Sequence, residues 1–410
     1  MKYQRFSPRQ TLTLTWWKRP EFAGYDGILC DGSIRSGKTV SMAVGFILWS
    51  MYSFNNESFA ICGRTIESLR RNVIVHLPSW LEGLFKVTER RAENKLIISV
   101  GGHSNTYYLF GGRDESSYTL VQGMTLAGVL FDEVALMPRS FVEQALARCS
   151  VAGSKFWFNC NPEGPMHWFY KEWVLECKRR NVLHLHFTMA DNLSLSEKIK
   201  QRYEGMYTGV FYARYILGKW TKAEGLVYPF FDAKKHMIDD DDGSRGRYYI
   251  SCDYGTLNPC VFGLWRINGN SAFMVKEYYY DGRKKGKQKT DEEYYADLEA
   301  FADGYLIEQV VIDPSAASFK ETIRRHGKFS VKNAKNDVLD GIRDTGTMLQ
   351  AGLLHFNKTC VNTKAEFGAY AWDEKASSDA VIKENDHSMD QMRYFVRTIM
   401  KREVRAYGIK

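Results

Sequence analysis

Residues 32–39 read GSIRSGKT, and they say more than any other stretch about how the first half of this chain folds. The octapeptide satisfies G-x-x-x-x-G-K-[ST], a pattern in which backbone N–H groups wrap phosphates, the lysine reaches the outer phosphates and the hydroxyl ligates Mg²⁺. An apolar run at residues 28–30 precedes it, and a helix-like apolar stretch at residues 40–52 follows it. A phosphate loop needs this order, because a helix N-terminus favours negative charge. The predicted nucleotide-binding residues are Gly32, Ser33, Ile34, Arg35, Ser36, Gly37, Lys38 and Thr39.

A pair of acidic residues follows a second apolar run. Residues 127–133 read AGVLFDE, so Asp132 and Glu133 come at the end of a predicted buried strand. Beside a phosphate loop, the first carboxylate would hold Mg²⁺ and the second would orient or deprotonate the attacking water. A protein that only binds nucleotide has no need of the second carboxylate. The pair therefore predicts ATP hydrolysis.

Two further features would serve this nucleotide site. Residues 155–161 end another predicted strand with Asn159 and Asn161, whose amides could sense the γ-phosphate. An arginine could neutralise the charge that develops in the transition state. The sequence leaves the choice open among three candidates, which are Arg35, Arg64 and Arg139.

Composition excludes several classes of protein. The chain has 410 residues, of which 44% are hydrophobic and 25% charged, as in a globular protein of more than one domain and unlike a disordered or fibrous one. No apolar run approaches the roughly 20 residues that cross a bilayer, so we expect no membrane contact. The eight cysteines lack metal-finger spacing and are expected to be reduced thiols of a cytoplasmic protein. The formal net charge of +8 favours nucleic-acid binding only slightly.

The two halves of the chain differ in pattern. Strands alternate with helices in the first half, which predicts a mostly parallel sheet covered on both faces. An acidic run at residues 239–242 with glycines after it makes residues 226–246 the best candidate for a linker. Beyond it, three strands form a predicted antiparallel meander and helices then alternate with strands. The second domain is therefore expected to be α/β with a mixed sheet.

Three carboxylates in the second half stand at the ends of predicted elements. Asp253 ends the strand YYISCDYG, Asp313 ends VVIDPS, and Asp390 lies three residues after His387 in a predicted helix. Residues three apart share a helix face, so the four side chains converge if this helix packs beside the strand ends. Converging carboxylates repel unless cations lie between them, and oxygen ligands suit Mg²⁺ or Mn²⁺. The pattern predicts a nuclease in which two metal ions clamp a phosphodiester.

Other polar residues are expected to be structural. In the second half we expect Asp386 to be the N-cap of the last helix, with Asp337 and Asp340 as first-turn acids of an earlier one. In the first half the strand histidines lack ligand spacing; they are His103, His184 and His186.

In the motifs of both sites, the chain resembles the large terminase subunit of tailed bacteriophages, an ATP-driven DNA-packaging motor with a nuclease. The resemblance covers nearly the whole chain and rests on GSIRSGKT, QGMTLAGVLFDEVALMP, NCNPEGP, RYILGKWTKAEGLVYPFF, SCDYG, VVIDPSA and NDHSMDQMRYF, in the order of the family. It implies a P-loop ATPase of the ASCE type over residues 1–225, with a small linker subdomain from about residue 178. A linker over residues 226–246 and a ribonuclease H-like nuclease over residues 247–410 would follow.

The resemblance also implies roles for residues of both sites. At the first site, Lys38 and Thr39 would bind the phosphates and Mg²⁺, and Glu133 would be the catalytic carboxylate. Asn161 would lie in the coupling motif, and Gln10 would read the adenine. At the second site, the metal ligands would be Asp253, Asp313 and Asp390, and His387 would lie beside them. Family members often carry the loop arginine at another position, which leaves the role of Arg35 open.

Cofactors and partners follow from the same resemblance. It implies ATP with Mg²⁺ at the first site and two ions of Mg²⁺ or Mn²⁺ at the second. The partners would be double-stranded DNA, a small terminase subunit, the portal protein of the procapsid and further copies of the chain in a ring. The protein would work in the host cytoplasm, docked transiently on the procapsid. Contacts with DNA phosphates would make translocation independent of sequence and sensitive to salt.

Two other classes of function also fit the motifs. A helicase or repair-type P-loop ATPase would have a second domain that binds nucleic acid without cutting it. A structural or switch P-loop protein would neither cut nor pump DNA. The variant Asp313→Asn tests the first alternative, and Glu133→Gln tests the second.

Overall fold

The computed structural model describes residues 5–207, 209–239, 245–256, 258–376 and 378–400. The chain divides into two compact units. Unit 1 comprises Met1–Gly205 and Val210–Lys222, and unit 2 comprises Met206–Gly209 and Ala223–Lys410. Residues 240–244, with most of the predicted acidic run, and residues 401–410 of the expected nuclease domain lie outside the described residues.

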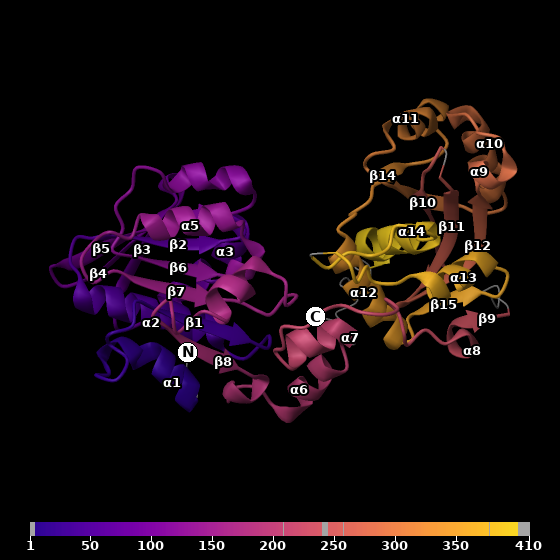
Figure 1. The fold of residues 1–410 in the computed structure, drawn as a ribbon. Helices are drawn as coiled ribbons and strands as arrows, with labels where there is room; N and C mark the ends of the chain where they lie inside the picture. The colour runs from indigo at the N-terminus through magenta and orange to yellow at the C-terminus, as the bar shows by residue number, and fades with distance from the viewer. Residues whose placement is uncertain (1–4, 208, 240–244, 257, 377, 401–410) are drawn as a thin grey trace. The chain divides into compact units, whose positions relative to one another are not determined.

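A mostly parallel sheet forms the centre of unit 1 (Figure 1). Within the described residues its order is β3 (Lys86–Arg90), β4 (Lys95–Val100), β5 (His103–Gly111), β2 (Ser58–Gly63), β6 (Gly128–Asp132), β7 (Lys155–Asn159), β1 (Gly27–Gly32) and β8 (Val182–Phe187). All neighbours from β5 to β8 are parallel, and at one edge β4 is antiparallel to both of its neighbours, β3 and β5. The carboxyl ends of β1, β6 and β7 therefore meet at one edge of the sheet.

Helices cover both faces of this sheet, as the near-continuous apolar strands require. On one face lie α1 (Pro8–Thr15) and α2 (Lys38–Ser53), where Phe46 and Trp49 pack on Trp157. On the other face lie α5 (Arg139–Ala147) and the π-helix η6 (Tyr170–Val174), where Trp173 packs on Phe158. Figure 1 shows α5 and α2 on opposite sides of the strands. The predicted three-layer α/β architecture is confirmed.

Unit 2 is built on a mixed sheet. Its order within the described residues is β14 (Val331–Asn333), β13 (Ile307–Ile312), β10 (Arg247–Asp253), β11 (Cys260–Asn268), β12 (Ser271–Tyr280), β15 (Leu354–Asn357) and β9 (Met237–Ile238). β10, β11 and β12 form the predicted antiparallel meander, and the remaining pairs are parallel. The mixed α/β sheet predicted for the second domain is thus confirmed.

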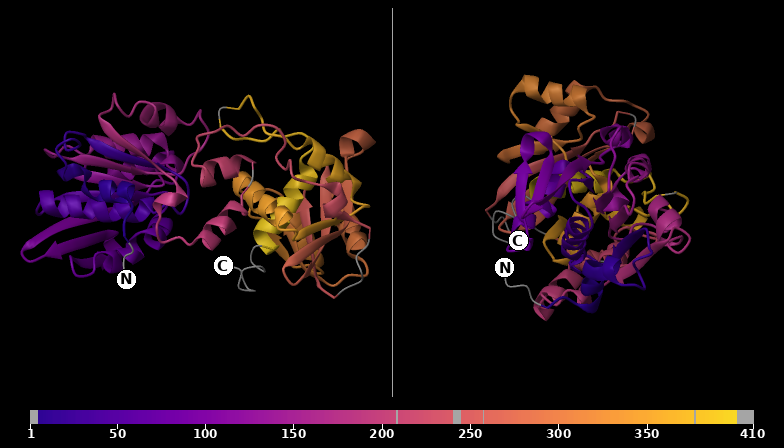
Figure 2. Two further views of the ribbon diagram at one scale, coloured as in Figure 1. Left: turned by 90° about the horizontal axis from the view of Figure 1, so that it is seen from below. Right: turned by 90° about the vertical axis from the view of Figure 1, so that its left-hand side faces the viewer.

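Helices also cover both faces of the unit 2 sheet (Figures 1 and 2). α10 (Asp291–Ala302) and α11 (Ala317–His326) bury Leu298 and Phe319 against one face. α14 (His387–Phe395) lies on the other face, where Phe395 stacks on Trp265 with ring centroids 4.3 Å apart. α12 (Val338–Gln350) and α13 (Val361–Ala369) pack beside α14. These contacts hold the start of α14 at the carboxyl ends of β10 and β13.

The residues expected to form a linker pack inside unit 2 wherever they are described. The backbone N–H of Val227 donates to the carbonyl of Tyr370 at 2.9 Å, and the buried ring of Tyr228 lies 5.7 Å from that of Phe367. β9 adds a further strand beside β15. The aromatic segment YPFF is too apolar to stay in solvent, so the division between units falls earlier, at residue 222. β8, near the start of the expected linker subdomain, belongs to the main sheet, and the subdomain itself stays a prediction.

The cysteines and the lengths of the helices bear on two further expectations. All eight cysteines are free thiols, as expected, and most are buried. Among the described residues, no helix combines the length and the apolar character needed to cross a membrane.

Candidate active sites

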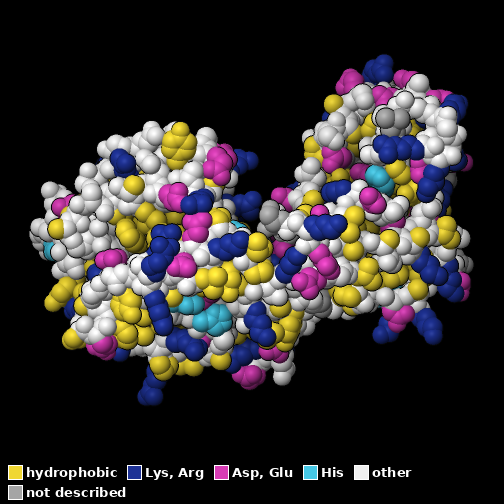
Figure 3. Space-filling model, in the orientation of Figure 1, with side chains coloured by type: hydrophobic (Ala, Val, Ile, Leu, Met, Phe, Trp, Pro, Cys, Tyr) yellow, Lys and Arg dark blue, Asp and Glu magenta, His cyan; other side chains and the backbone are white. Residues whose placement is uncertain are grey.

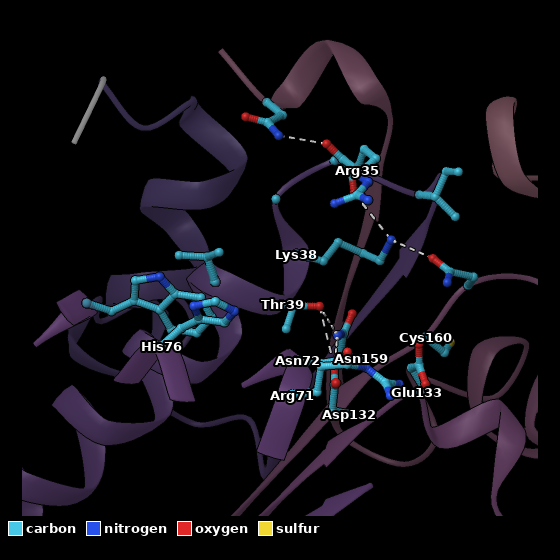
Figure 4. Close-up of a pocket in the computed structure, with 17 residues that line it drawn as sticks. Arg35, Lys38, Thr39, Arg71, Asn72, His76, Asp132, Glu133, Asn159 and Cys160 are labelled. Carbon is cyan, nitrogen blue, oxygen red and sulfur yellow. Dashed lines mark hydrogen bonds between the residues drawn. The ribbon is translucent and has the colours of Figure 1, made fainter. Parts of the chain in front are cut away.

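The phosphate loop lies between β1 and α2, where the sequence predicted it. Gly37 is the N-cap of α2 and has φ 85°, a left-handed conformation that glycine adopts without strain. The loop and the ends of β6 and β7 line a pocket of about 530 Å³ (Figure 4). Lys38, Thr39, Asp132, Glu133 and Asn161 all line it, so the pocket brings together the main residues predicted for the first site.

Lys38 is folded back onto its own loop. Its Nζ donates to the carbonyl oxygens of Gly32 at 3.1 Å and Ser33 at 2.7 Å, and to Oδ1 of Asn161 at 3.1 Å. Burial lowers the pKa of Lys38 to about 8, although nearby negative groups oppose this shift. Phosphate oxygens could replace these acceptors and would favour the charged ammonium.

Thr39, Asp132 and Asn159 form one hydrogen-bonded group. Nδ2 of Asn159 donates to Oδ1 of Asp132 at 2.6 Å and to Oγ1 of Thr39 at 3.0 Å. Burial and the charge of Glu133 raise the pKa of Asp132 to about 7, and the hydrogen bond from Asn159 opposes the rise. A carboxylate and a hydroxyl side by side fit Mg²⁺, because this cation prefers oxygen ligands. A bound cation would in turn favour the ionised form of Asp132.

Glu133 stands in a strained conformation directly after β6. Its φ of 61° is left-handed, which costs a non-glycine residue about 1–3 kcal/mol. Burial raises the pKa of Glu133, and the positive charges of Arg64 and Arg71 oppose the rise. In Figure 4 the guanidinium of Arg71 points toward Glu133. The side chain of Glu133 therefore lines the pocket, where the arginine charges offset part of the effect of burial on its pKa.

The arginines near this site differ in whether they line the pocket. Arg35 and Arg71 line the pocket, and the guanidinium of Arg35 lies 5.4 Å from the ring centre of Tyr203. Arg139 instead forms ion pairs with Glu143 at 2.7 Å and Glu172 at 2.8 Å. The sequence reading missed Arg71, whose only signal is its place in the pair Arg70 and Arg71 after the second strand.

Gln10 lies behind the phosphate loop rather than among the residues that line the pocket. It is buried, and its Oε1 accepts a hydrogen bond of 2.9 Å from the backbone N–H of Ser7 in the capping box of α1. Its Nε2 lies beside Gly37, since a Cβ built at that glycine would be 2.2 Å away. The adenine-reading role of Gln10 stays a prediction.

Asp253 and Asp313 stand side by side at the second site. β10 and β13 are parallel neighbours, and Cys252 is paired in register with Ile312. Asp253 is the last residue of β10, and Asp313 follows the last residue of β13. The adjacency that the sequence reading assumed for these two strand ends is therefore present.

α14 places three side chains over these strand ends. Nδ1 of His387 lies 2.8 Å from Oδ2 of Asp253, and the hydroxyl of Tyr394 donates to Oδ2 of Asp313 at 2.8 Å. Oδ1 of Asp390 accepts from Arg393 at 2.6 Å. The sequence reading missed Tyr394, although His387, Asp390 and Tyr394 have the spacing i, i+3, i+7 that marks one helix face.

The charges of this group act on one another. Burial raises the pKa of Asp253 to about 6, with the hydrogen bond from His387 opposing and the charge of Asp390 adding to the rise. Burial also raises the pKa of Tyr394, and the negative charges of Asp253, Asp390 and Asp313 raise it further. The tyrosine hydroxyl therefore bonds Asp313 and is subject to the negative charge of all three carboxylates.

These carboxylates do not stand as a ready-made metal centre. Within the described part of the chain, no three His, Cys, Asp or Glu side chains are placed to hold one ion together. Oxygens of Asp253, Asp313 and Asp390 are already bonded to His387, Tyr394 and Arg393. The donor chemistry suits Mg²⁺ or Mn²⁺, but a shared ion requires these side chains to turn. The metal centre thus stays a prediction.

The first N–H groups of α14 bond a carboxylate from another helix. Asp386 occupies the N-cap position, but its side chain makes no capping hydrogen bond and instead pairs with Lys383 at 3.1 Å. Oε2 of Glu366, from α13, accepts from the backbone N–H groups of Ser388 at 2.7 Å and Met389 at 3.3 Å. A carboxylate from another helix can cap because the first N–H groups of a helix lack internal partners. Asp386 is thus the N-cap residue, as predicted, but the carboxylate that accepts from the first N–H groups is that of Glu366.

Residues 29–235 match the family described as terminase large subunit, T4likevirus-type, N-terminal. The large terminase subunit of Escherichia phage T5 is 20% identical over 293 residues, which make up 67% of this chain and 65% of that protein. The chain therefore aligns with somewhat less than two thirds of the length of that relative.

Solved structures of the large terminase from a thermophilic bacteriophage are more similar. One is 51% identical with a TM-score of 0.92, and the match covers 97% of this chain and all of that one. A complex of the same protein with ADP has 50% identity and a TM-score of 0.88 and covers 96% and 100% of the two chains. A complex with ATP-γ-S has 50% identity and a TM-score of 0.87 and covers 97% and 100%.

Proposed function

Since the chain belongs to the large terminase subunit family, we propose that it hydrolyses ATP to move double-stranded DNA and cuts that DNA at its second site. The observation that carries the proposal is the group of Thr39, Asp132 and Asn159 beside Glu133 in one pocket. The complexes of the thermophilic phage terminase with ADP and with ATP-γ-S support a nucleotide in this pocket.

The main charged and polar residues of the pocket each have a place in the proposed hydrolysis. Glu133 accepts the proton of the attacking water. Lys38 leaves the loop carbonyls and binds the outer phosphates. Mg²⁺, held by Thr39 and Asp132, would neutralise phosphate charge when ATP is bound. Arg35, Arg64 or Arg71 adds positive charge to the transition state.

Asn161 offers a route from the nucleotide to movement. Its Oδ1 accepts from Nζ of Lys38 at 3.1 Å, so capture of phosphate by Lys38 breaks this contact. The segment after β7 would then be free to shift, and DNA held by its phosphates would move with it. Basic side chains are spread among acidic ones over the visible face of each unit in Figure 3, so charge alone does not single out the gripping surface.

For the second site we propose cleavage of a phosphodiester with Asp253, Asp313 and Asp390 as ligands of Mg²⁺ or Mn²⁺. The ions would stabilise charge on the attacking and leaving oxygens. His387 would hold Asp253 in place through its Nδ1. The side-by-side strand ends and the shared face of α14 support this assignment.

The proposed partners are those of a packaging motor. They are double-stranded DNA, a small terminase subunit, the portal protein of the procapsid and further copies of the chain in a ring on that portal. The site of action would be the host cytoplasm, with transient docking on the procapsid. Family membership supports these proposals.

Glu133→Gln tests the ATPase. ATP turnover should collapse while ATP-γ-S still binds, because the amide keeps the shape of the side chain but cannot accept the proton. Glu143→Gln is the matched control, since Glu143 lies on the surface and pairs with Arg139. Unchanged ATP turnover in Glu133→Gln would refute the hydrolysis proposal and favour a switch protein.

Asp313→Asn tests the nuclease. Plasmid cleavage by the full chain with Mn²⁺ should disappear while ATP turnover stays. Asp303→Asn is the control, since Asp303 is exposed at the end of α10. Cleavage that persists in Asp313→Asn would overturn the nuclease assignment and favour a second unit that only binds nucleic acid.

A further inference from the structure

A buried carboxylate that the proposed chemistry does not use lies directly before the phosphate loop. Asp31, on β1, is 1% exposed. Its Oδ1 is 2.9 Å from Nε2 of His184 and 2.9 Å from Nδ1 of His186, and its Oδ2 accepts from Nε1 of Trp220 at 2.7 Å. Burial alone would raise the pKa of Asp31, but the hydrogen bonds of these three side chains hold it below its ordinary range. Asp31 is therefore an anchored charge at the base of the loop.

The three partners come from two parts of the chain. His184 and His186 alternate along β8, the strand next to β1, so their contacts tie neighbouring strands of one sheet. Trp220 comes from residues 212–222, which we call the connector. The connector is the last segment of unit 1, and after it the chain continues in unit 2 from Ala223. Of these three side-chain bonds, the one from Trp220 joins Asp31 to a segment that leads out of unit 1.

The connector also touches the phosphate loop itself. The backbone N–H of Ile34 donates to the carbonyl of Tyr215 at 2.8 Å. A Cβ added to Gly218, which has φ 70°, would lie 2.9 Å from the backbone nitrogen of Ser33, so the two backbones are in close contact. These backbone contacts place the connector directly against the phosphate loop.

A second anchor joins the connector to the segment after β7. The buried guanidinium of Arg214 pairs with Glu163 at 3.6 Å and donates to the carbonyl of Thr221 at 2.6 Å. The ring of Trp220 stacks on Tyr170 with centroids 4.9 Å apart. The connector thus contacts both parts of the nucleotide site that are expected to move, the phosphate loop and the segment that contains Asn161.

We propose that Asp31 and Trp220 form the joint through which occupancy of the phosphate loop is transmitted to the connector and so to the start of unit 2. The inference rests on the proposed ATP-driven motor and names a positioning pair for it, since neither residue lines the nucleotide pocket. A short bond from an indole N–H to a buried carboxylate is directional and charge-assisted, so it can transmit a displacement. Lys38 is linked to the same charge, because the negative charge of Asp31 favours its ammonium form.

The test is hydrogen–deuterium exchange of the full chain with and without ATP-γ-S. In the parent chain, the nucleotide should slow exchange in residues 32–39 and change it in the connector. In Trp220→Phe, which keeps the aromatic ring but loses the N–H donor, the effect at residues 32–39 should stay and the effect in the connector should fall by about tenfold, the worth of one hydrogen bond to a charged group. Trp220→His restores an N–H donor and should recover part of the effect.

Trp168→Phe is the matched control, since Trp168 is a partly buried tryptophan of the same unit that packs on Phe169. It should behave like the parent chain. A nucleotide effect in the connector that survives Trp220→Phe overturns the proposal. Loss of the effect at residues 32–39 as well overturns it too, because Trp220 would then support nucleotide binding itself.

These outcomes are separate from failure of the proposed function. A parent chain that binds ATP-γ-S but neither hydrolyses ATP nor moves DNA would refute the motor and leave the exchange result intact. If ATP-γ-S leaves hydrogen–deuterium exchange in the connector of the parent chain unchanged while ATP turnover is normal, only the proposed joint is refuted. The variant Asp31→Asn removes the anchored charge, and it should reduce the connector effect as Trp220→Phe does; a connector effect of the parent size refutes the proposal.

Discussion

The side-chain amide of Asn159 donates a hydrogen bond of 2.6 Å to Oδ1 of Asp132. The bond joins the last residues of β7 and β6, which are paired in register. The same amide reaches Oγ1 of Thr39 at 3.0 Å. One asparagine therefore aligns the two oxygen groups expected to bind Mg²⁺ and keeps the pKa of Asp132 lower than burial alone would set it.

Asn159→Ala should weaken Mg²⁺-dependent binding of ATP-γ-S by about tenfold, because the pKa of Asp132 rises further and its carboxylate loses alignment. Titrations with Mg²⁺ and with EDTA measure the effect. Asn161→Ala is the control, since Asn161 contacts Lys38 and its loss should act equally with and without Mg²⁺. Equal loss under both conditions in Asn159→Ala would refute the role.

Arg71→Gln should lower kcat for ATP hydrolysis at least about tenfold, because Arg71 faces Glu133 in the pocket and supplies charge to the site. Steady-state kinetics measure it. The neighbouring Arg70 bonds Glu89 at 3.0 Å and Asn94 at 3.0 Å, so Arg70→Gln is a control that should leave kcat unchanged. An Arg71 variant with normal kcat would exclude this arginine from the chemistry.

Tyr394→Phe should raise the affinity of the full chain for Mn²⁺ by about threefold to tenfold, because its hydroxyl occupies Oδ2 of Asp313 and competes with a cation for it. Calorimetric titration compares the variant with the parent chain. Asp313→Asn should remove the gain when combined with Tyr394→Phe. Weaker Mn²⁺ binding in Tyr394→Phe would instead mean that the tyrosine helps to build the site.

Glu366 makes the stability of unit 2 depend on pH. Burial raises its pKa from 4.5 to about 7, although the N–H groups of Ser388 and Met389 oppose the rise. Between these values the folded chain holds a proton that the unfolded chain releases, so this contribution to stability falls as pH rises from about 4.5 to 7. Glu366→Gln carries no such charge and should flatten the fall, as thermal unfolding at pH 5 and pH 8 would show.

Glu366→Ala is the companion variant. It leaves the N–H groups of Ser388 and Met389 without their acceptor and should lower the free energy of unfolding by about 1–3 kcal/mol at both pH values. An identical pH dependence in the parent chain and in Glu366→Gln would show that Glu366 is not the titrating group.

The nucleotide site was largely predictable from local patterns. A phosphate loop, the acid pair at Asp132 and Glu133 and the strand ending at Asn159 each depend on a few consecutive residues, and parallel strands bring their carboxyl ends to one edge. Arg71 and the Asp31 cluster could not be predicted, because their partners depend on which helix or strand packs beside the loop. In the sequence, nothing distinguishes His184 and His186 from other strand residues. They contact Asp31 only because β8 lies next to β1.

Local chain chemistry was enough to establish the two α/β sheets, the phosphate loop and the positions of Asp253 and Asp313 at strand ends. Packing alone established the state of those groups: Tyr394 on Asp313, Glu366 at the start of α14, and Trp220 on Asp31. The reason is physical. Hydrophobic period and loop pattern act over a few residues, whereas burial and the partner of each charge arise only when segments far apart in sequence come together.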